Sequence, residues 1–211
     1  MIIPRQHQGF SLLELLAVLA IIAVVIAFVV PSMSGILRGN DMTRGEQMFQ
    51  QQLALARQTA VANNRRVEVR LYEFDDPDVV GTDRLYRALQ TFILAEDNTA
   101  KPLGNVQKLP NTVAINTTTT ASTLMNLPDK TFDATKDPQI KLPGVGTTYT
   151  AKAFQFRPDG STNLSSATVA DWFITLVSTN PITQVNSTTL PPNFATIQID
   201  RIGGTVRSYR P

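Results

Sequence analysis

The chain begins with a polar leader and continues into a long apolar stretch in which Glu14 is the only charged residue. From Phe10 to Val30 there are twenty-one residues without another Asp, Glu, Lys or Arg. As a helix rising about 1.5 Å per residue, the stretch is roughly 32 Å long and can cross the hydrocarbon core of a bilayer. The pattern predicts a transmembrane helix over residues 10–30. A carboxylate in such a span costs about 2.5–3.5 kcal/mol on insertion scales, so Glu14 requires a partner or a task.

Pro31 ends the apolar stretch and predicts a kink in the helix, because proline has no amide hydrogen to donate. Beyond it, apolar and small residues recur at spacings of three and four. They are Met42, Gly45, Phe49, Leu53, Ala56, Ala60 and Asn63. This spacing predicts that residues 31–63 form the amphipathic half of the same helix, with one face docked on a sheet. The pair Asn63 and Asn64 predicts where the helix stops.

After Asn64 the period changes to two, which indicates strands. Val67, Val69 and Leu71 alternate with polar residues, so the first strand is expected to be half-buried. Residues 85–94 alternate in the same way and predict a hairpin partner. Strand patterns return at residues 172–177 and 197–209.

The last strand pattern contains Gly203 and Gly204, which suit a tight primed turn. In contrast, residues 116–150 are rich in Thr, Pro, Asp and Lys with little periodicity, which predicts a long irregular insertion. The expected fold class is α+β, with a long N-terminal transmembrane helix whose C-terminal half packs on a mostly antiparallel sheet. Residues 64–211 would form this β-rich globular head.

The composition excludes much catalytic chemistry. There is no Cys, and the one His, His7, precedes the apolar stretch. The rest of the chain therefore cannot build a Ser-His-Asp or Cys-His site, or a thiolate or imidazole zinc site. We expect no enzyme, no cofactor and no bound metal. A head that uses paired carboxylates for carbohydrate or peptide hydrolysis is the enzymatic alternative, and no carboxylate spacing supports it.

The residues around Gly9 resemble the cleavage and N-methylation signal of type IV prepilins: a polar leader, Gly9, Phe10, three residues, Glu14 and an apolar run. The resemblance implies that a prepilin peptidase and N-methyltransferase removes residues 1–9 and methylates the new amine of Phe10. Arg5 would keep the leader on the cytoplasmic side. Glu14 follows Phe10 by four residues, so it could neutralise this ammonium. The resemblance further implies that Glu14 acts in assembly, by pairing with the amine of a neighbouring subunit.

The alternative interpretation of the N-terminus is a plain membrane anchor or an uncleaved signal. Such an anchor has no use for a carboxylate about one turn into its apolar stretch, as Glu14 is.

Four further stretches resemble the GspH/FimT branch of minor pseudopilins. They are the helix-to-strand run Leu53–Val67, the Leu-Pro-x-x-Val segment Leu109–Val113, the Phe-x-Pro-x-Gly element Phe154–Gly160 and the end of the chain, 197–209. The resemblance implies a minor pilin-like subunit of a type II secretion or type IV pilus system. It would cross the bacterial inner membrane once, with its head in the periplasm. It would then assemble with other pilins or pseudopilins, on an inner-membrane assembly platform, into a pseudopilus or pilus. The alternative is a type IV pilus minor subunit for adhesion or DNA uptake.

Three polar groups in the head have alternative interpretations. The acidic residues at 75, 76, 78 and 83 could bind calcium, but they lack EF-hand spacing, which favours a solvated turn. The Thr-rich segment 117–123 could carry glycans or form a plain surface loop. If the first and last strands are neighbours, a basic patch could contact DNA through Arg65, Arg66, Arg207 and Arg210, with Arg70 and Arg201 beside them. The balance of 19 Lys and Arg against 17 Asp and Glu argues for solvated strand faces instead.

Overall fold

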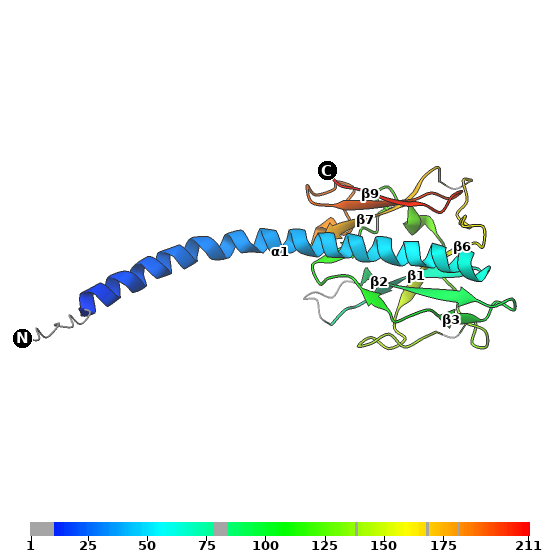
Figure 1. The fold of residues 1–211 in the computed structure, drawn as a ribbon, viewed down its shortest axis with the longest axis horizontal. Helices are drawn as coiled ribbons and strands as arrows, with labels where there is room; N and C mark the ends of the chain where they lie inside the picture. The colour runs from blue at the N-terminus through cyan, green and yellow to red at the C-terminus, as the bar shows by residue number, and fades with distance from the viewer. Residues whose placement is uncertain (1–10, 78–83, 138, 168, 181) are drawn as a thin grey trace, which may run out of the picture. The chain divides into compact units, whose positions relative to one another are not determined.

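The computed structural model describes residues 11–77, 84–137, 139–167, 169–180 and 182–211, with the side chains of 27–38 excepted (Figure 1). The predicted leader and the cleavage pair Gly9 and Phe10 lie outside the described residues. The chain divides into two units, Met1–Gly39 and Asn40–Pro211, and each is described by itself. Helix α1, Leu12–Asn63, contributes to both.

The end of α1 was predicted correctly. Asn64 adopts the left-handed conformation with φ 51°, and the Arg65 amide donates to the Ala60 carbonyl at 3.1 Å. An asparagine in this conformation satisfies the last carbonyls of a helix and stops it.

The head contains two antiparallel sheets, and Figure 1 shows the second half of α1 in front of them, with β7 and β9 above it and β2 and β3 below it. In the first sheet the order is β3-β2-β1-β6, and β4 also pairs with β2. Its strands are β1 (Val67–Phe74), β2 (Leu85–Leu94), β3 (Ala100–Pro102), β4 (Gln107–Lys108) and β6 (Thr150–Phe156). In the second sheet the order is β5-β7-β8-β9. Its strands are β5 (Val113–Ile115), β7 (Trp172–Ser178), β8 (Ala195–Ile199) and β9 (Val206–Tyr209).

Two short 3-10 helices complete the described elements, η1 (Thr123–Asn126) and η2 (Ile182–Gln184). The predicted hairpins β1–β2 and β8–β9 are confirmed by their antiparallel registers. The expected α+β class, with the second half of the helix on antiparallel strands, is also confirmed.

The apolar face of α1 fills the main core between the two sheets. Its buried members are each at most 1% exposed: Met42, Phe49, Leu53, Ala56 and Ala60. They belong to one cluster with inward residues of both sheets, for example Val69 of β1 and Ile174 of β7. Gly45 lies where the helix passes closest to the loop before β5, since a Cβ there would lie 3.2 Å from the Leu109 side chain. The predicted docking face is therefore correct except at its last member, Asn63, which is exposed where the helix ends.

The prediction that the first strand is half-buried was wrong. Glu68, Arg70 and Tyr72, which the alternating pattern assigns to solvent, are 5%, 0% and 0% exposed. The outer face of β1 is buried because the insertion 116–150 packs over it: Tyr149 meets Tyr72 edge-on, with ring centroids 5.0 Å apart. Leu142 joins the same outer cluster.

The insertion itself is mostly irregular, as predicted, but it is not peripheral to the core. Leu124 and Met125 of η1 belong to the main cluster under α1.

The turn between β8 and β9 is wider than the predicted two-residue turn. The Asp200 carbonyl accepts the Gly204 amide at 2.8 Å, and the Asp200 amide donates to Thr205 at 2.9 Å. With Gly204 at φ 62°, this is the pattern of a G1 bulge, in which a left-handed glycine adds one residue to a strand. The bulge fixes the register of β9.

Residues from three distant stretches meet at this bulge. The Arg57 side chain of α1 donates through Nε to the Gly160 carbonyl at 3.4 Å. Gly204 packs against both groups, and a Cβ on it would lie 2.1 Å from the Gly160 oxygen. The helix end, the turn after β6 and the last hairpin therefore converge on one contact that only glycine permits at position 204.

We predict that Gly204→Ala destabilises the head by roughly 3 kcal/mol or more, because it combines left-handed strain with a backbone clash. Denaturant unfolding of the full chain in detergent, followed by the fluorescence of Trp172, measures the change. The matched control is Gly104→Ala, since no atom lies within 4 Å of a Cβ there. It should change stability by no more than about 0.5 kcal/mol. Equal stability of the two variants would contradict the packing described for Gly204.

Candidate functional site

The described part of the apolar segment exposes apolar side chains on every side of α1. Large apolar residues from Leu12 to Ile26 are between 47% and 82% exposed. A helix that is apolar all round needs an apolar environment, either lipid or other helices. The apolar surface of this segment is therefore suited to lipid or to packing against other helices.

No helix among the described residues meets the length and hydropathy of a membrane span. The predicted span 10–30 extends over Phe10 and over the side chains of 27–30, which are outside the description. The transmembrane assignment stays a prediction. So does the kink at Pro31, although α1 is helical through that position.

Glu14 lies in the first turn of α1 and takes part in a helix cap. The Glu14 amide donates to the Ser11 side-chain oxygen at 3.2 Å, which makes Ser11 the capping residue. The Ser-x-x-Glu spacing is that of a capping box, in which the Glu side chain turns back toward the start of the helix. Sequence reasoning missed Ser11, although this spacing would have revealed it. An acidic side chain that turns back in this way also lies near any positive charge at the helix start.

The predicted basic patch does not form as expected, because β1 and β9 belong to different sheets. The Arg65 side chain contacts Glu96 at 3.5 Å, and Arg66 donates to Asn98 at 2.5 Å. The Arg210 Nε donates to Glu46 at 2.6 Å. Arg207 is exposed on β9. The four arginines are thus dispersed, and a DNA contact by any of them stays a prediction.

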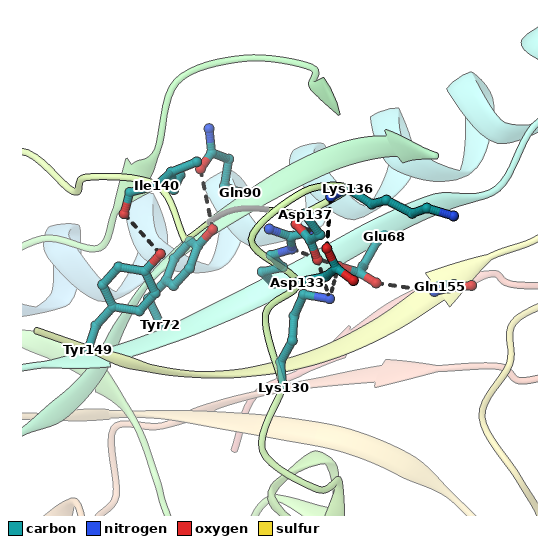
Figure 2. Close-up of polar contacts among 11 residues, drawn as sticks. Glu68, Tyr72, Gln90, Lys130, Asp133, Lys136, Asp137, Ile140, Tyr149 and Gln155 are labelled. Carbon is teal, nitrogen blue, oxygen red and sulfur yellow. Dashed lines mark hydrogen bonds and ion pairs between the residues drawn. The ribbon is translucent and has the colours of Figure 1, made fainter. Parts of the chain in front are cut away.

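Arg70 is fully buried and belongs to a charge cluster between β1 and the insertion. It pairs with Glu68 and Asp137, each at 2.6 Å. Lys130 reaches the same two carboxylates at 3.0 and 2.8 Å. Figure 2 shows Lys130, Asp137 and Glu68 converging, and Gln155 donating to Glu68. Two cations and two anions therefore balance one another, with Arg70 fully buried and Lys130 and Asp137 each 13% exposed.

Aromatic rings complete the surroundings of this cluster. The Arg70 guanidinium lies 3.6 Å from the centroid of the Phe92 ring. Burial raises the pKa of Tyr72 well above its ordinary value, and the nearby Arg70 charge offsets part of that rise. The Tyr72 hydroxyl donates to Gln90, so it is a neutral hydrogen-bond donor in the core. The arrangement is a compact polar network, in which the buried Arg70 Nη1 is left without a hydrogen-bond partner among the described residues.

A second buried pair corrects the predicted solvated turn after β1 at Asp76, whereas Asp75 is exposed as expected. Asp76 is 3% exposed and accepts the Arg87 guanidinium at 3.0 Å. Arg87 also donates to the carbonyl oxygens of Leu109 and Pro110 at 3.3 and 2.9 Å. The pair thus holds the Leu-Pro-x-x-Val loop, which packs against Gly45 of α1.

Among the residues that the structure describes, no group of three or more His, Asp or Glu side chains is placed to hold a metal ion. The acidic positions 78 and 83 lie outside them. The Asp133 carboxylate accepts hydrogen bonds from the backbone N–H groups of Lys136 and Thr135, and these bonds lower its pKa.

Residues 4–30 match the family described as the prokaryotic N-terminal methylation motif. The predicted prepilin-type signal is thus confirmed, while the bond that is cut stays a prediction. No curated protein sequence matches the chain.

Two solved structures of the minor pseudopilin EpsH, from the type II secretion system of Vibrio cholerae, are similar to this chain. The first is 14% identical and covers 81% of this chain and 98% of its own, with a TM-score of 0.44. The second is 13% identical and covers 82% and 95%, with a TM-score of 0.42. TM-scores of this size do not by themselves establish a shared fold.

We predict that Asp137→Asn destabilises the head by roughly 3 kcal/mol, because it leaves the buried Arg70 and Lys130 short of one negative charge. Chemical denaturation of the full chain gives the difference. The matched control is Asp129→Asn, which removes a carboxylate that pairs with Lys152 but is 67% exposed. It should cost less than about 1 kcal/mol. If both substitutions lower the free energy of unfolding by the same amount, the burial of the charge cluster does not explain its contribution to stability.

Proposed function

We propose that this chain is a minor pilin-like structural subunit of the pseudopilin type, assembled into a pseudopilus or pilus. The observation that carries the proposal is the methylation motif over residues 4–30, followed by an apolar helix exposed on all sides. The motif supports processing by a prepilin peptidase and N-methyltransferase. The exposed apolar surface supports insertion in the inner membrane first and packing against the helices of other pilins or pseudopilins later.

The head supports a structural role. The buried arginines Arg70 and Arg87 donate hydrogen bonds to carboxylates and backbone carbonyls within the head. With no His or Cys after His7, the head has few means of acid-base or nucleophilic catalysis. In this proposal it lies in the periplasm on a single-pass anchor. The assembly platform in the inner membrane drives it into a filament of a type II secretion system, and it needs no cofactor.

The alternative is a type IV pilus minor subunit for adhesion or DNA uptake. Arg207 is exposed and lines a hollow of about 390 Å³ together with Arg201, which gives that alternative some cationic surface. Asp171 and Asp200 line the same hollow and reduce its positive potential. The dispersed arginines therefore favour the structural role.

Intact-mass spectrometry of the chain, expressed with and without a prepilin peptidase, tests the proposal. With the peptidase, we expect a mature chain that starts at N-methylated Phe10 and has lost residues 1–9. Substitution of Gly9 by Leu should block the cut, because a side chain at this position no longer fits an extended protease cleft. The control Gly39→Ala should be processed normally, since a Cβ there meets no atom within 4 Å. A retained Met1, or a cut beyond Pro31, would refute the proposal.

A further inference from the structure

Of the four sheet edges formed by the described strands of the head, three are contacted by other parts of the chain. On β6, the outer edge is covered by the insertion and by the turn that follows. There the Lys130 amide donates to Ala151 at 2.7 Å, and the Asn163 amide donates to Gln155 at 3.0 Å. An edge covered in this way offers a new strand few backbone groups.

The other end of the same sheet is also covered. Ala100 of β3 donates to the Lys136 carbonyl at 3.0 Å, and Pro102 has no amide hydrogen. In the second sheet, the edge strand β5 lies against the buried Arg87, whose Nε donates to Val113 at 3.3 Å.

The remaining edge is β9, and the described residues show no hydrogen bond from another segment to its outer side. The G1 bulge pairs Asp200 with Thr205. Because bonded and non-bonded pairs alternate in antiparallel sheets, Arg207 and Tyr209 direct their backbone groups toward β8. The amides and carbonyls of Val206 and Ser208 therefore point away from the sheet.

A groove of about 400 Å³ lies between this edge and α1. Its walls carry side-chain amides from the helix and backbone from the bulge: Gln50, Gln51, Ala54, Arg57, Gln58, Gly204, Thr205 and Val206. Glutamine amides both donate and accept hydrogen bonds, so they complement an extended backbone. The groove and the free edge together match the mode in which a peptide adds one strand to a sheet.

We propose that the outer edge of β9 binds an extended, acidic segment of a different polypeptide chain, which adds to the second sheet beside α1. The charge of the edge selects this occupant. Arg207 is exposed, whereas the Arg210 guanidinium already pairs with Glu46 at 2.5 Å. A second copy of β9 would bring a second Arg207 to the same edge, and like charges on neighbouring strands repel. A partner strand with Glu or Asp beside Arg207 gains an opposite-charge pair instead.

Binding of a probe peptide to the full chain in detergent tests this inference. The probe is a short capped peptide of alternating valine and glutamate, labelled for fluorescence anisotropy. Two control peptides have the same pattern, one with lysine in place of glutamate and one with methylated backbone nitrogens. We expect the first peptide to bind and both controls to bind at least about fivefold more weakly, because each loses charge pairing or backbone hydrogen bonds.

Two protein variants locate the binding site. Ser208→Pro removes only the outward amide, since this N–H does not bond to β8, and should weaken binding roughly fivefold or more. Ser208→Ala keeps the amide and should bind like the unchanged chain. In hydrogen exchange, the amides at 206 and 208 should gain protection when the peptide is added, whereas the amide at 207 is protected from the start.

Equal binding of the methylated and unmethylated peptides to the unchanged chain would overturn the inference, and this comparison needs no protein variant to fold. Failure of the glutamate peptide to bind would also overturn it, as would binding of duplex DNA in its place. The N-terminal processing of the chain does not enter this experiment, so its outcome is separate from that of the mass measurement.

Discussion

The packing of one face of α1 between two sheets is the contact on which the rest of the head depends. From Met42 to Ala60, the buried side chains of this face supply the centre of a core that also contains inward residues of β1, β7 and β8. Apart from the short 3-10 helix η1, which adds Leu124 and Met125 to the same core, no other described helix covers the inner face of either sheet. The second half of the helix and the head therefore fold as one unit, from Asn40 onward. The loop held by Arg87 and the bulge at Gly204 fix the two ends of this contact.

Local periodicity predicted the parts of the fold whose partners lie nearby in the sequence. It found the end of α1 at Asn63, the β1–β2 hairpin and the β8–β9 hairpin, because each depends on spacing or turn residues within a short window. It failed at the outer face of β1. An arginine buried under a distant segment gives the same alternating pattern as one in solvent, and the segment that covers Arg70 has no periodicity of its own. The contact between Arg70 and Asp137 joins positions 67 residues apart, beyond the reach of pattern arguments.

The charge cluster under the insertion explains how an irregular segment can adopt one arrangement. Few of its residues form strands, so apolar packing alone would leave its path weakly specified. Buried ion pairs add little net stability, but they are costly to break, because a charge without its partner cannot remain in the core. We therefore expect Lys130 and Asp137 to hold the insertion in place over Glu68 and Arg70, while Tyr149 and Leu142 supply its apolar contacts.

At the N-terminus, the two roles considered for Glu14, in the helix cap and in the predicted pairing with the Phe10 amine, place different demands on its side chain. At the N3 position of a capping box, the fourth residue of the Ser-x-x-Glu sequence, it needs only a polar side chain, and glutamine serves that position equally well. As the counter-charge of a mature Phe10 amine it must be ionised. The proportion of the chain recovered in sheared filaments, measured for Glu14→Gln against the unchanged chain, therefore tests directly whether a charge pair drives assembly. Our account predicts normal processing but little Glu14→Gln chain in filaments, and incorporation at the unchanged level would contradict it.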